Sequence, residues 1–471
     1  MIGRKKGIAV LMTLVLIAFA ALAGCSSGNG TNSSSPGMGQ GSQENQGSSG
    51  TQQQKEPVTL EAWIMPNSPQ PDKDFLAVLK PFLDQNPNIQ VKVTVLDWGS
   101  AWSKITTAAT SGQGPDILQL GTTWVPAIAA MGALAPLTDQ MNELGGAESY
   151  YPATWNTTHI AGDNTIYAAP WFVDARALYY RTDVFEKAGL NATDVFKDWN
   201  SFKEALKKVN GMEIEGKKIS AFGFPGKNDW NVAHNIFPWI WAAGGNVLNE
   251  DNTEAIINSK EALDGIMFYT GLAAEGLVSK TTLEQNTSQV EANYANGDYA
   301  VMISGPWILK QFTTPKDQGG QKESIAASRS AVHPLPAGPN GVFTFFGGSD
   351  LTIFKNTKHF AEAWAVVKYL SGKDAQLAYA QASGQLPAVK EVMNSPDITS
   401  DPNMAQFVQA AQTSRSYPSI PQWGPIENVL VKHFGIMWDI VAGVGGKPYN
   451  RESIQAEMDA AKQEIDALLH Q

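Results

Sequence analysis

Apolar and polar positions along residues 58–131 switch between two periods, one typical of strands and one typical of helices. Short apolar runs or strict alternation predict strands at residues 58–63, 89–95 and 116–120. Apolar side chains at helical spacing predict helices at residues 72–85, 100–111 and 124–131. Pro81 favours a kink in the first of these helices. Strands and helices that alternate at this pace predict an α/β domain with a largely parallel sheet.

A charge pair interrupts the apolar stretch at residues 169–183. Asp174 and Arg176 are two positions apart, so a strand would present both on the same face. An ordinary buried strand is a run of Val, Ile and Leu, and a charge pair there needs a reason. Two explanations stay open at this point: the pair binds a polar ligand, or it is a buried salt bridge between two parts of the fold.

The first residues of the chain have the pattern of a bacterial export signal. Three basic residues at positions 4–6 precede an apolar run at 7–22, which is too short and too soon followed by polar sequence to read as a membrane span. The Leu-Ala-Gly-Cys sequence at 22–25 resembles the lipobox, in which the cysteine takes a diacylglycerol and becomes the new N-terminus. Residues 1–24 are therefore the predicted signal peptide and Cys25 the predicted lipidation site; the alternative is an ordinary cleavage site beside an incidental cysteine.

Residues 25–56 would then comprise the lipidated cysteine and a tether rich in Ser, Gly, Gln and Asn. Such a segment cannot bury enough apolar surface to become ordered, and its length gives a reach of about 30 Å. Cys25 is the only cysteine, which excludes an intramolecular disulfide. Loss of the three basic signal residues takes the net charge from −11 to −14, which argues against nucleic acid or an anionic membrane surface as a partner.

The remaining chain, residues 57–471, is too long for one compact core and predicts two lobes. A series of motifs runs along it in order: NPNIQV at 86–91, SGQGPDI at 111–117, AAP at 168–170, ALYYRTDVF at 177–185, WNSF at 199–202, ANGDYAVM at 295–302, GPW at 305–307, FGGS at 346–349 and AEAWAVVKYL at 361–370. In this order the motifs resemble those of the extracellular solute-binding proteins of carbohydrate ABC transporters, the maltose-binding-protein-like family.

The resemblance implies the two-lobed α/β fold of periplasmic binding proteins, class II type, with the ligand in a cleft between the lobes. The lobes would be residues 57–169 plus 347–395 at the N-terminal side and residues 170–346 plus 396–471 at the C-terminal side. The partners implied are two permease subunits and, through them, an ATPase. The protein would be a monomer on the extracellular face of the cell membrane, held by its lipid anchor as in Gram-positive bacteria.

Candidate ligand-binding residues follow from the chemistry of a sugar, which has apolar ring faces and a rim of hydroxyl groups. Flat aromatic rings match the faces, and charged or amide side chains match the rim. The residues predicted to bind ligand are Trp63, Trp98, Asp116, Trp124, Trp171, Asp174, Arg176, Trp241, Trp307 and Trp423. Core packing is the alternative for each tryptophan, and Asp116 has a second reading as the cap of a local turn. Glu61 and Asp97 are further possibilities, whereas Trp199, Trp364 and Trp438 are predicted core residues.

Sequence motifs for catalysis, metal binding or a cofactor are absent. The six histidines are not at metal-ligand spacing, and the motif at 111–117 departs from the dinucleotide fingerprint because Ile117 replaces the third glycine. The sequence therefore favours a protein that is not an enzyme and that captures a sugar, with an oligosaccharide preferred, by closure of two lobes. The alternatives are a polyol or glycerol phosphate on the same scaffold, and a surface glycoside hydrolase that uses Asp116 and Asp174 as its carboxylate pair.

Overall fold

The computed structural model describes residues 56–227 and 229–470. The predicted signal peptide, Cys25 and nearly all of the predicted tether lie outside these residues. Within the described part of the chain, no helix is both long and apolar enough to cross a membrane.

A seven-stranded sheet, here called the large sheet, has the order β12-β4-β11-β3-β1-β2, with β13 paired to β11. Its strands are β1 (Val58–Ile64), β2 (Ile89–Val95), β3 (Ile117–Gly121), β4 (Ala168–Ala175), β11 (Thr344–Ile353), β12 (Leu386–Pro387) and β13 (Ser414–Arg415). β1 pairs in parallel with β2 and β3, whereas β11 pairs antiparallel with both β3 and β4. β4 therefore runs in the same sense as β1, β2 and β3, whereas β12 pairs antiparallel with β4 and runs with β11. The predicted largely parallel sheet is thus wrong for the later strands β11 and β12, which make the sheet mixed.

The first helices lie where the hydrophobic pattern predicts them. They are α1 (Pro71–Gln85), α2 (Trp98–Ser111) and α3 (Val125–Ala130). α1 buries Phe75, Val78 and Leu79, and it continues through Pro81. α2 begins after Asp97, whose side chain accepts a hydrogen bond from the Gly99 backbone N–H at 3.0 Å and so caps the helix.

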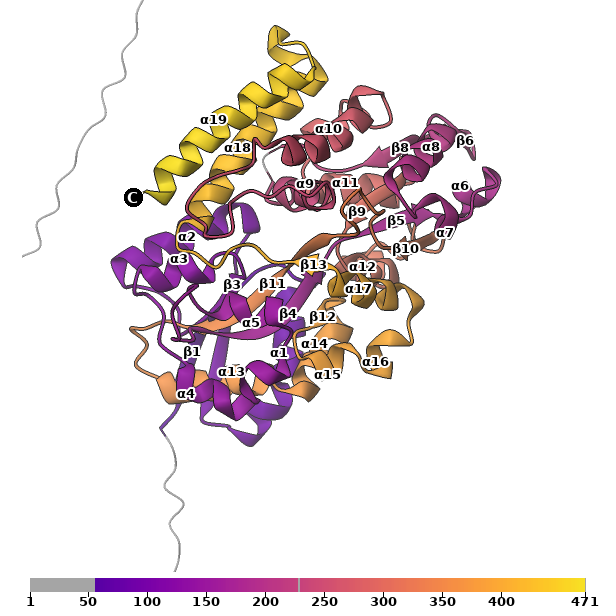
Figure 1. The fold of residues 1–471 in the computed structure, drawn as a ribbon. Coiled ribbons are helices and arrows are strands. Elements are labelled where there is room, and N and C mark those ends of the chain that lie inside the picture. Colours follow the sequence, from indigo (N-terminus) through magenta and orange to yellow (C-terminus); the bar gives the residue numbers. More distant parts are fainter. Residues whose placement is uncertain (1–55, 228, 471) are drawn as a thin grey trace, which may run out of the picture. The chain divides into compact units, whose positions relative to one another are not determined.

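A second sheet, here called the small sheet, has four strands in the order β10-β5-β9-β8. They are β5 (Ala177–Arg181), β8 (Ser220–Gly223), β9 (Tyr299–Ser304) and β10 (Ser330–His333). One apolar core joins this sheet to several helices, among them α8 (Trp199–Val209), α9 (Asn231–Ala242), α10 (Lys260–Ala274), α18 (Trp423–Ala442) and α19 (Arg451–Leu469). α18 packs against α19 as a pair of long helices near the C-terminus (Figure 1).

The chain passes from the large sheet to the small sheet at Arg176. β4 ends in the large sheet at Ala175, and β5 begins in the small sheet at Ala177. β11 lies beside β4, with Phe346 opposite Ala175 and Gly347 opposite Asp174 (Figure 1). The stretch at 169–183 is therefore two strands of different sheets, and Asp174 and Arg176 lie where they meet. The predicted lobe boundaries stay a prediction.

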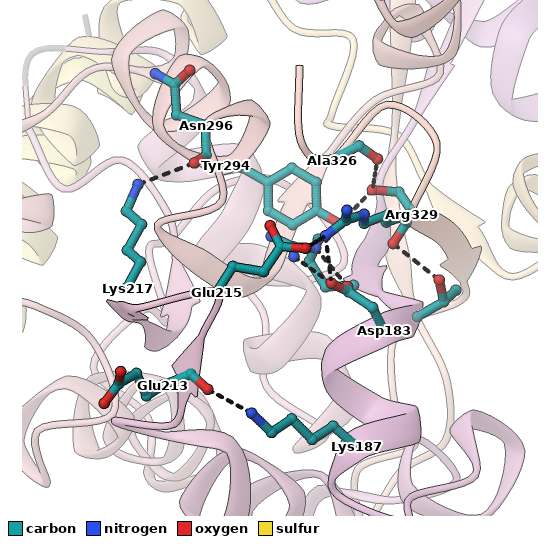
Figure 2. Close-up of polar contacts among 12 residues, drawn as sticks. Asp183, Lys187, Glu213, Glu215, Lys217, Tyr294, Asn296, Ala326 and Arg329 are labelled. Atoms are coloured by element: carbon teal, nitrogen blue, oxygen red, sulfur yellow. Dashed lines mark hydrogen bonds and ion pairs between the residues drawn. The ribbon is translucent and has the colours of Figure 1, made fainter. Parts of the chain in front are cut away.

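A short hairpin, β6 (Glu213–Ile214) with β7 (Lys217–Lys218), is tied to the small-sheet side by polar contacts (Figure 2). Glu215, in the turn at φ 51°, pairs with Arg329 at 2.8 Å. Arg329 also lies 3.4 Å from Asp183, which in turn pairs with the buried Arg181 at 2.6 Å. These contacts tie the Arg181 end of β5 to the hairpin turn.

Candidate functional site

An ion pair lies at the junction of the two sheets. Arg176 Nη2 is 2.8 Å from Asp174 Oδ2, and the two side chains are only 4% and 12% exposed. The same Nη2 donates a hydrogen bond to Asn231 Oδ1 at 2.5 Å, and Asn231 is the first residue of α9. The charge pair predicted from sequence is therefore formed, and an amide from the small-sheet side completes it.

An indole covers one face of the Arg176 guanidinium. The Arg176 Cζ atom lies 4.6 Å from the centre of the Trp307 ring, within the range of a cation–π contact. Trp307 begins α12 (Trp307–Thr313), and its Nε1–H donates to Glu291 Oε1 at 2.9 Å. The Ser304 hydroxyl donates to the same carboxyl oxygen at 2.7 Å. Glu291, on α11 (Thr287–Ala295), thus fixes the orientation of the ring that covers Arg176. We call Asp174, Arg176, Asn231, Glu291 and Trp307 the polar site.

A second group of polar side chains is stacked beside the polar site. The His234 ring lies parallel to the Phe345 ring at 4.0 Å, and Phe345 is 5.9 Å from the Arg176 Cζ atom. His234 Nδ1 is 2.6 Å from the Tyr417 hydroxyl and 3.7 Å from a carboxyl oxygen of Glu427. His234 on α9, Tyr417 in the segment before α18 and Glu427 on α18 therefore form a group of polar side chains, and the Arg176 charge acts on His234 and Tyr417.

Burial shifts the protonation of these groups toward their neutral forms. It raises the pKa of Glu291 to about 7 and that of Glu427 to about 8. Burial also raises the pKa of Asp174, an effect that the Arg176 charge opposes. It lowers the pKa of His234 well below its usual value, and Arg176 adds to that lowering. The site thus combines one permanent cation with carboxyl groups that can donate or accept hydrogen bonds near neutral pH.

Several buried polar atoms here have no hydrogen-bond partner among the described residues. They are Asp174 Oδ1, Arg176 Nε and both carboxyl oxygens of Glu427. Buried polar atoms in native proteins are nearly always paired with protein, water or ligand. The polar site and its neighbours therefore offer both donors and acceptors for a polar molecule.

Four indoles form a second feature near this site, here called the indole cluster: Trp98, Trp102, Trp124 and Trp230. Trp124 is at its centre, with ring centres 5.5 Å from Trp98, 5.5 Å from Trp102 and 5.7 Å from Trp230. It is 2% exposed, and the other three are half-buried. Trp98, Trp102 and Trp230 all pack against the apolar core that contains Trp124; Trp98 and Trp102 are on α2, whereas Trp230 immediately precedes α9 on the small-sheet side. The predicted candidates Trp98 and Trp124 are thus packed with two indoles that the sequence did not single out.

Three predicted tryptophans lie in apolar cores. Trp171 is 1% exposed and stacks on Tyr379 at 4.3 Å. Trp423 is also 1% exposed, packed against Tyr417 at 4.8 Å. Trp241 is buried and donates from Nε1 to Asn246 Oδ1 at 3.2 Å. Their role in ligand binding stays a prediction, and their burial favours the core-packing alternative.

The remaining two candidates lie on the large sheet. Trp63 is half-buried on β1, and its Nε1 is 3.3 Å from Glu61 Oε1. Asp116 accepts hydrogen bonds from the Glu61 backbone N–H at 2.8 Å and from the Thr357 hydroxyl. These bonds join the segments that carry β1, β3 and β11, which favours a structural role for Asp116.

Sequence reasoning missed part of the site. Asn231, His234, Glu291, Tyr417 and Glu427 carry no motif and come from segments more than 50 residues from Arg176 along the chain. Trp102 and Trp230 contribute to the high tryptophan count, which was the only signal for them. Trp199, Trp364 and Trp438 are in the helices where core packing was predicted; Trp364 and Trp438 are buried, and Trp199 is half-buried against Trp239.

Two surface pockets lie away from these residues. One of about 270 Å³ is lined by side chains that include Thr138, Trp155 and Asp163. The other, of about 540 Å³, is lined by side chains that include Tyr180, Phe196 and His333. Neither contains a candidate ligand-binding residue. In the described part of the chain, no group of three or more His, Cys, Asp or Glu side chains is placed to hold a metal ion.

The fold, with two sheets joined at a buried polar site, is that of a two-lobed α/β binding protein. A structure of an ABC transporter solute-binding protein from Thermotoga lettingae, bound with α-D-tagatose, superposes with a TM-score of 0.75 at 24% identity, over 87% of this chain and 99% of that one. The predicted fold class is thereby confirmed.

The sequence matches the family described as "Bacterial extracellular solute-binding protein" over residues 66–377, and the chain belongs to this family. A putative binding protein of Brucella abortus (strain 2308) is 27% identical over 356 residues, 75% of this chain and 82% of that protein. The diacetylchitobiose binding protein DasA of Streptomyces coelicolor is 26% identical over 372 residues, 79% of this chain and 82% of that protein. The family resemblance predicted from the sequence is confirmed.

Proposed function

We propose that this chain captures a sugar outside the cell and delivers it to an ABC import permease. The observation that carries the proposal is the polar site: a buried arginine paired with Asp174, covered by the Trp307 indole and placed where the two sheets meet. An indole face can pack against the apolar face of a sugar ring, and the charged and amide groups around it can hydrogen-bond to the hydroxyl groups of the sugar. The family of extracellular solute-binding proteins to which the chain belongs supports this proposal, and its relative DasA is named as a diacetylchitobiose binding protein.

The mechanism proposed is closure of the two lobes on the ligand. A ligand that contacts both lobes shifts an open-to-closed equilibrium by no more than its preference for the closed form. The closed form would be recognised by two permease subunits, which act with an ATPase. A lipid at Cys25 would anchor the monomer to the outer face of the cell membrane.

An anionic solute such as glycerol phosphate is the weaker candidate. Arg176 is the cation of the polar site, and it is already paired with Asp174. Glu291 and Glu427 add carboxyl groups rather than cations nearby, so Arg176 is the one positive charge that the named residues offer a phosphate. A neutral polyhydroxylated ligand fits this balance better, and a polyol remains the second candidate.

A glycoside hydrolase is the other alternative from sequence. Asp116 is held by two hydrogen bonds within the large-sheet side, and Asp174 is paired with Arg176. A general acid and a nucleophile both need to face the sugar, so this pair is a poor candidate for catalysis. Incubation of the protein with oligosaccharides is expected to leave them intact, and turnover would contradict the proposal.

A thermal-shift panel tests the substrate class directly. The panel is maltotriose, N,N′-diacetylchitobiose, D-tagatose and ribitol, with glycerol 3-phosphate as the anionic comparison. A ligand that binds only the folded protein raises its unfolding midpoint, by an amount set by its concentration relative to Kd. At least one of the three sugars is expected to raise the midpoint more than ribitol or glycerol 3-phosphate. A shift with glycerol 3-phosphate alone would replace the sugar by an anionic solute.

A further inference from the structure

Gly424 lies against an indole from the other side of the molecule. It is the second residue of α18, which packs in the core of the small sheet. Trp102 is on α2, which follows β2 of the large sheet. A Cβ atom placed on Gly424 would lie 2.6 Å from Trp102 Cη2 and 3.1 Å from Trp102 Cζ2. Any side chain at position 424 would therefore push the Trp102 ring away from α18.

The sign of φ does not require glycine at this position. Gly424 is not among the residues with positive φ, and it is the second residue of α18, directly before Pro425. A Cβ atom before a proline disfavours the helical conformation, so a side chain at position 424 would meet Pro425 as well as Trp102. The close approach of Trp102 is the feature that involves the large-sheet side.

The Trp102 contact belongs to the indole cluster, which joins the two sides of the molecule. Trp102 and Trp98 pack on Trp124, and Trp230 reaches from the start of α9 onto the same ring. α18 also contacts α3, the helix that follows Trp124. The contact between α2 and Gly424 is thus part of one continuous apolar surface between the large-sheet and small-sheet sides.

This surface is next to the polar site along the chain. Trp230 precedes Asn231, which accepts the hydrogen bond from Arg176. Glu427, whose carboxyl oxygens have no hydrogen-bond partner among the described residues, is three residues after Gly424 on α18. A change in the distance between α2 and α18 would therefore alter the geometry of the groups that surround the ligand.

We propose that Gly424 and Trp102 form a lobe-to-lobe contact that sets the affinity for the solute without touching it. The lack of a side chain at 424 lets α18 approach α2 closely enough for the indole cluster to assemble around Trp124. This contact stabilises the closed form, in which the ligand is held. The inference rests on the proposed function, because it concerns closure around that ligand.

The variant Gly424→Ala tests the contact because it places a Cβ atom against the Trp102 ring. The variant is titrated calorimetrically with the sugar of the panel that gives the largest thermal shift. Its affinity is expected to be about tenfold weaker than that of wild type, because a smaller fraction of the protein is in the closed form. The unfolding midpoint without sugar is expected to fall slightly, because a Cβ atom before Pro425 disfavours the helical backbone, so the titration is done well below that midpoint. The matched control is Gly435→Ala in the same helix, where the nearest atom to a new Cβ is Lys227 Cγ at 3.9 Å; its affinity is expected to equal that of wild type.

A double variant separates the contact from a general disturbance of α18. Trp102→Phe shortens the ring that meets position 424, so Gly424→Ala is expected to cost little further affinity in the Trp102→Phe background. Equal affinity of Gly424→Ala and wild type would overturn the inference and leave the proposed function standing. If the free-energy losses of the two single variants simply add in the double variant, the inference would also be overturned. Failure of wild type to bind any sugar of the panel would overturn the proposed function, and the inference with it.

Discussion

At the scale of single residues, the site is built from polar groups whose pKa values are shifted by burial. Glu291 and Glu427 are ordinary glutamates in the sequence, and only their surroundings bring their pKa values into the neutral range. Asp174 and Arg176 could be predicted, because a charge pair in an apolar strand is visible as a pattern. The two glutamates could not, because nothing local to either residue shows that helices α11 and α18 bury them beside Arg176.

Glu427 predicts a dependence of stability on pH. Its pKa is about 8 in the folded protein and 4.5 for a free side chain, so between these values the folded state holds a proton that the unfolded state has lost. The contribution of Glu427 to stability is therefore fully present below pH 4.5 and falls as pH rises toward 8. Between pH 6 and pH 8, wild type is expected to lose about 2 kcal/mol more than Glu427→Gln.

Urea denaturation of both proteins at several pH values measures this difference. Glu391→Gln is the control, since Glu391 is an exposed side chain paired with Lys373. It is expected to follow wild type at every pH. Parallel pH profiles for wild type and Glu427→Gln would show that Glu427 is not buried in its neutral form.

At the scale of elements, hydrophobic periodicity predicted the first three strands and helices within a few residues. These elements could be predicted because the apolar residues that each strand or helix buries recur at a regular spacing within its own sequence. The junction at Arg176 was harder to predict, because β4 and β5 form one continuous apolar stretch in the sequence although they belong to different sheets. The pairing of β11 with β4 depends on segments more than 150 residues apart, and no local pattern encodes it.

The ion pair at this junction makes a prediction about folding without ligand. Asp174→Ala would leave the Arg176 charge buried beside the Asn231 amide and the rings of Trp307 and Phe345, with no carboxylate paired to it. Removal of one partner of a buried pair is expected to lower the free energy of unfolding by about 3 kcal/mol, even with no sugar present. Urea denaturation in sugar-free buffer measures this change.

The comparison for that experiment is an exposed pair on the same chain. Lys217 and Asp298 lie 2.5 Å apart with side chains 42% and 34% exposed. Asp298→Ala is expected to change stability by less than about 1 kcal/mol. If Asp174→Ala were as mild as Asp298→Ala, the pair would serve the ligand rather than the fold.

At the scale of the whole molecule, the order of motifs predicted the family and the two-lobed fold, and both are confirmed. Which tryptophans bind ligand was harder to predict from the sequence. Tryptophan is used in cores and in sugar sites alike, and only the structure separates the buried Trp171 and Trp423 from the half-buried Trp307 over Arg176. Trp307 is therefore the indole on which the account depends.

The most direct test of the central claim is a calorimetric titration of the best sugar of the panel into wild type and Trp307→Ala. The account predicts that wild type binds and that the variant binds at least about tenfold more weakly, which corresponds to about 1.4 kcal/mol. Trp155→Ala is the control: its half-buried indole stacks on Tyr150 away from the polar site, and its affinity is expected to match wild type. Equal affinity of Trp307→Ala and wild type would contradict the account.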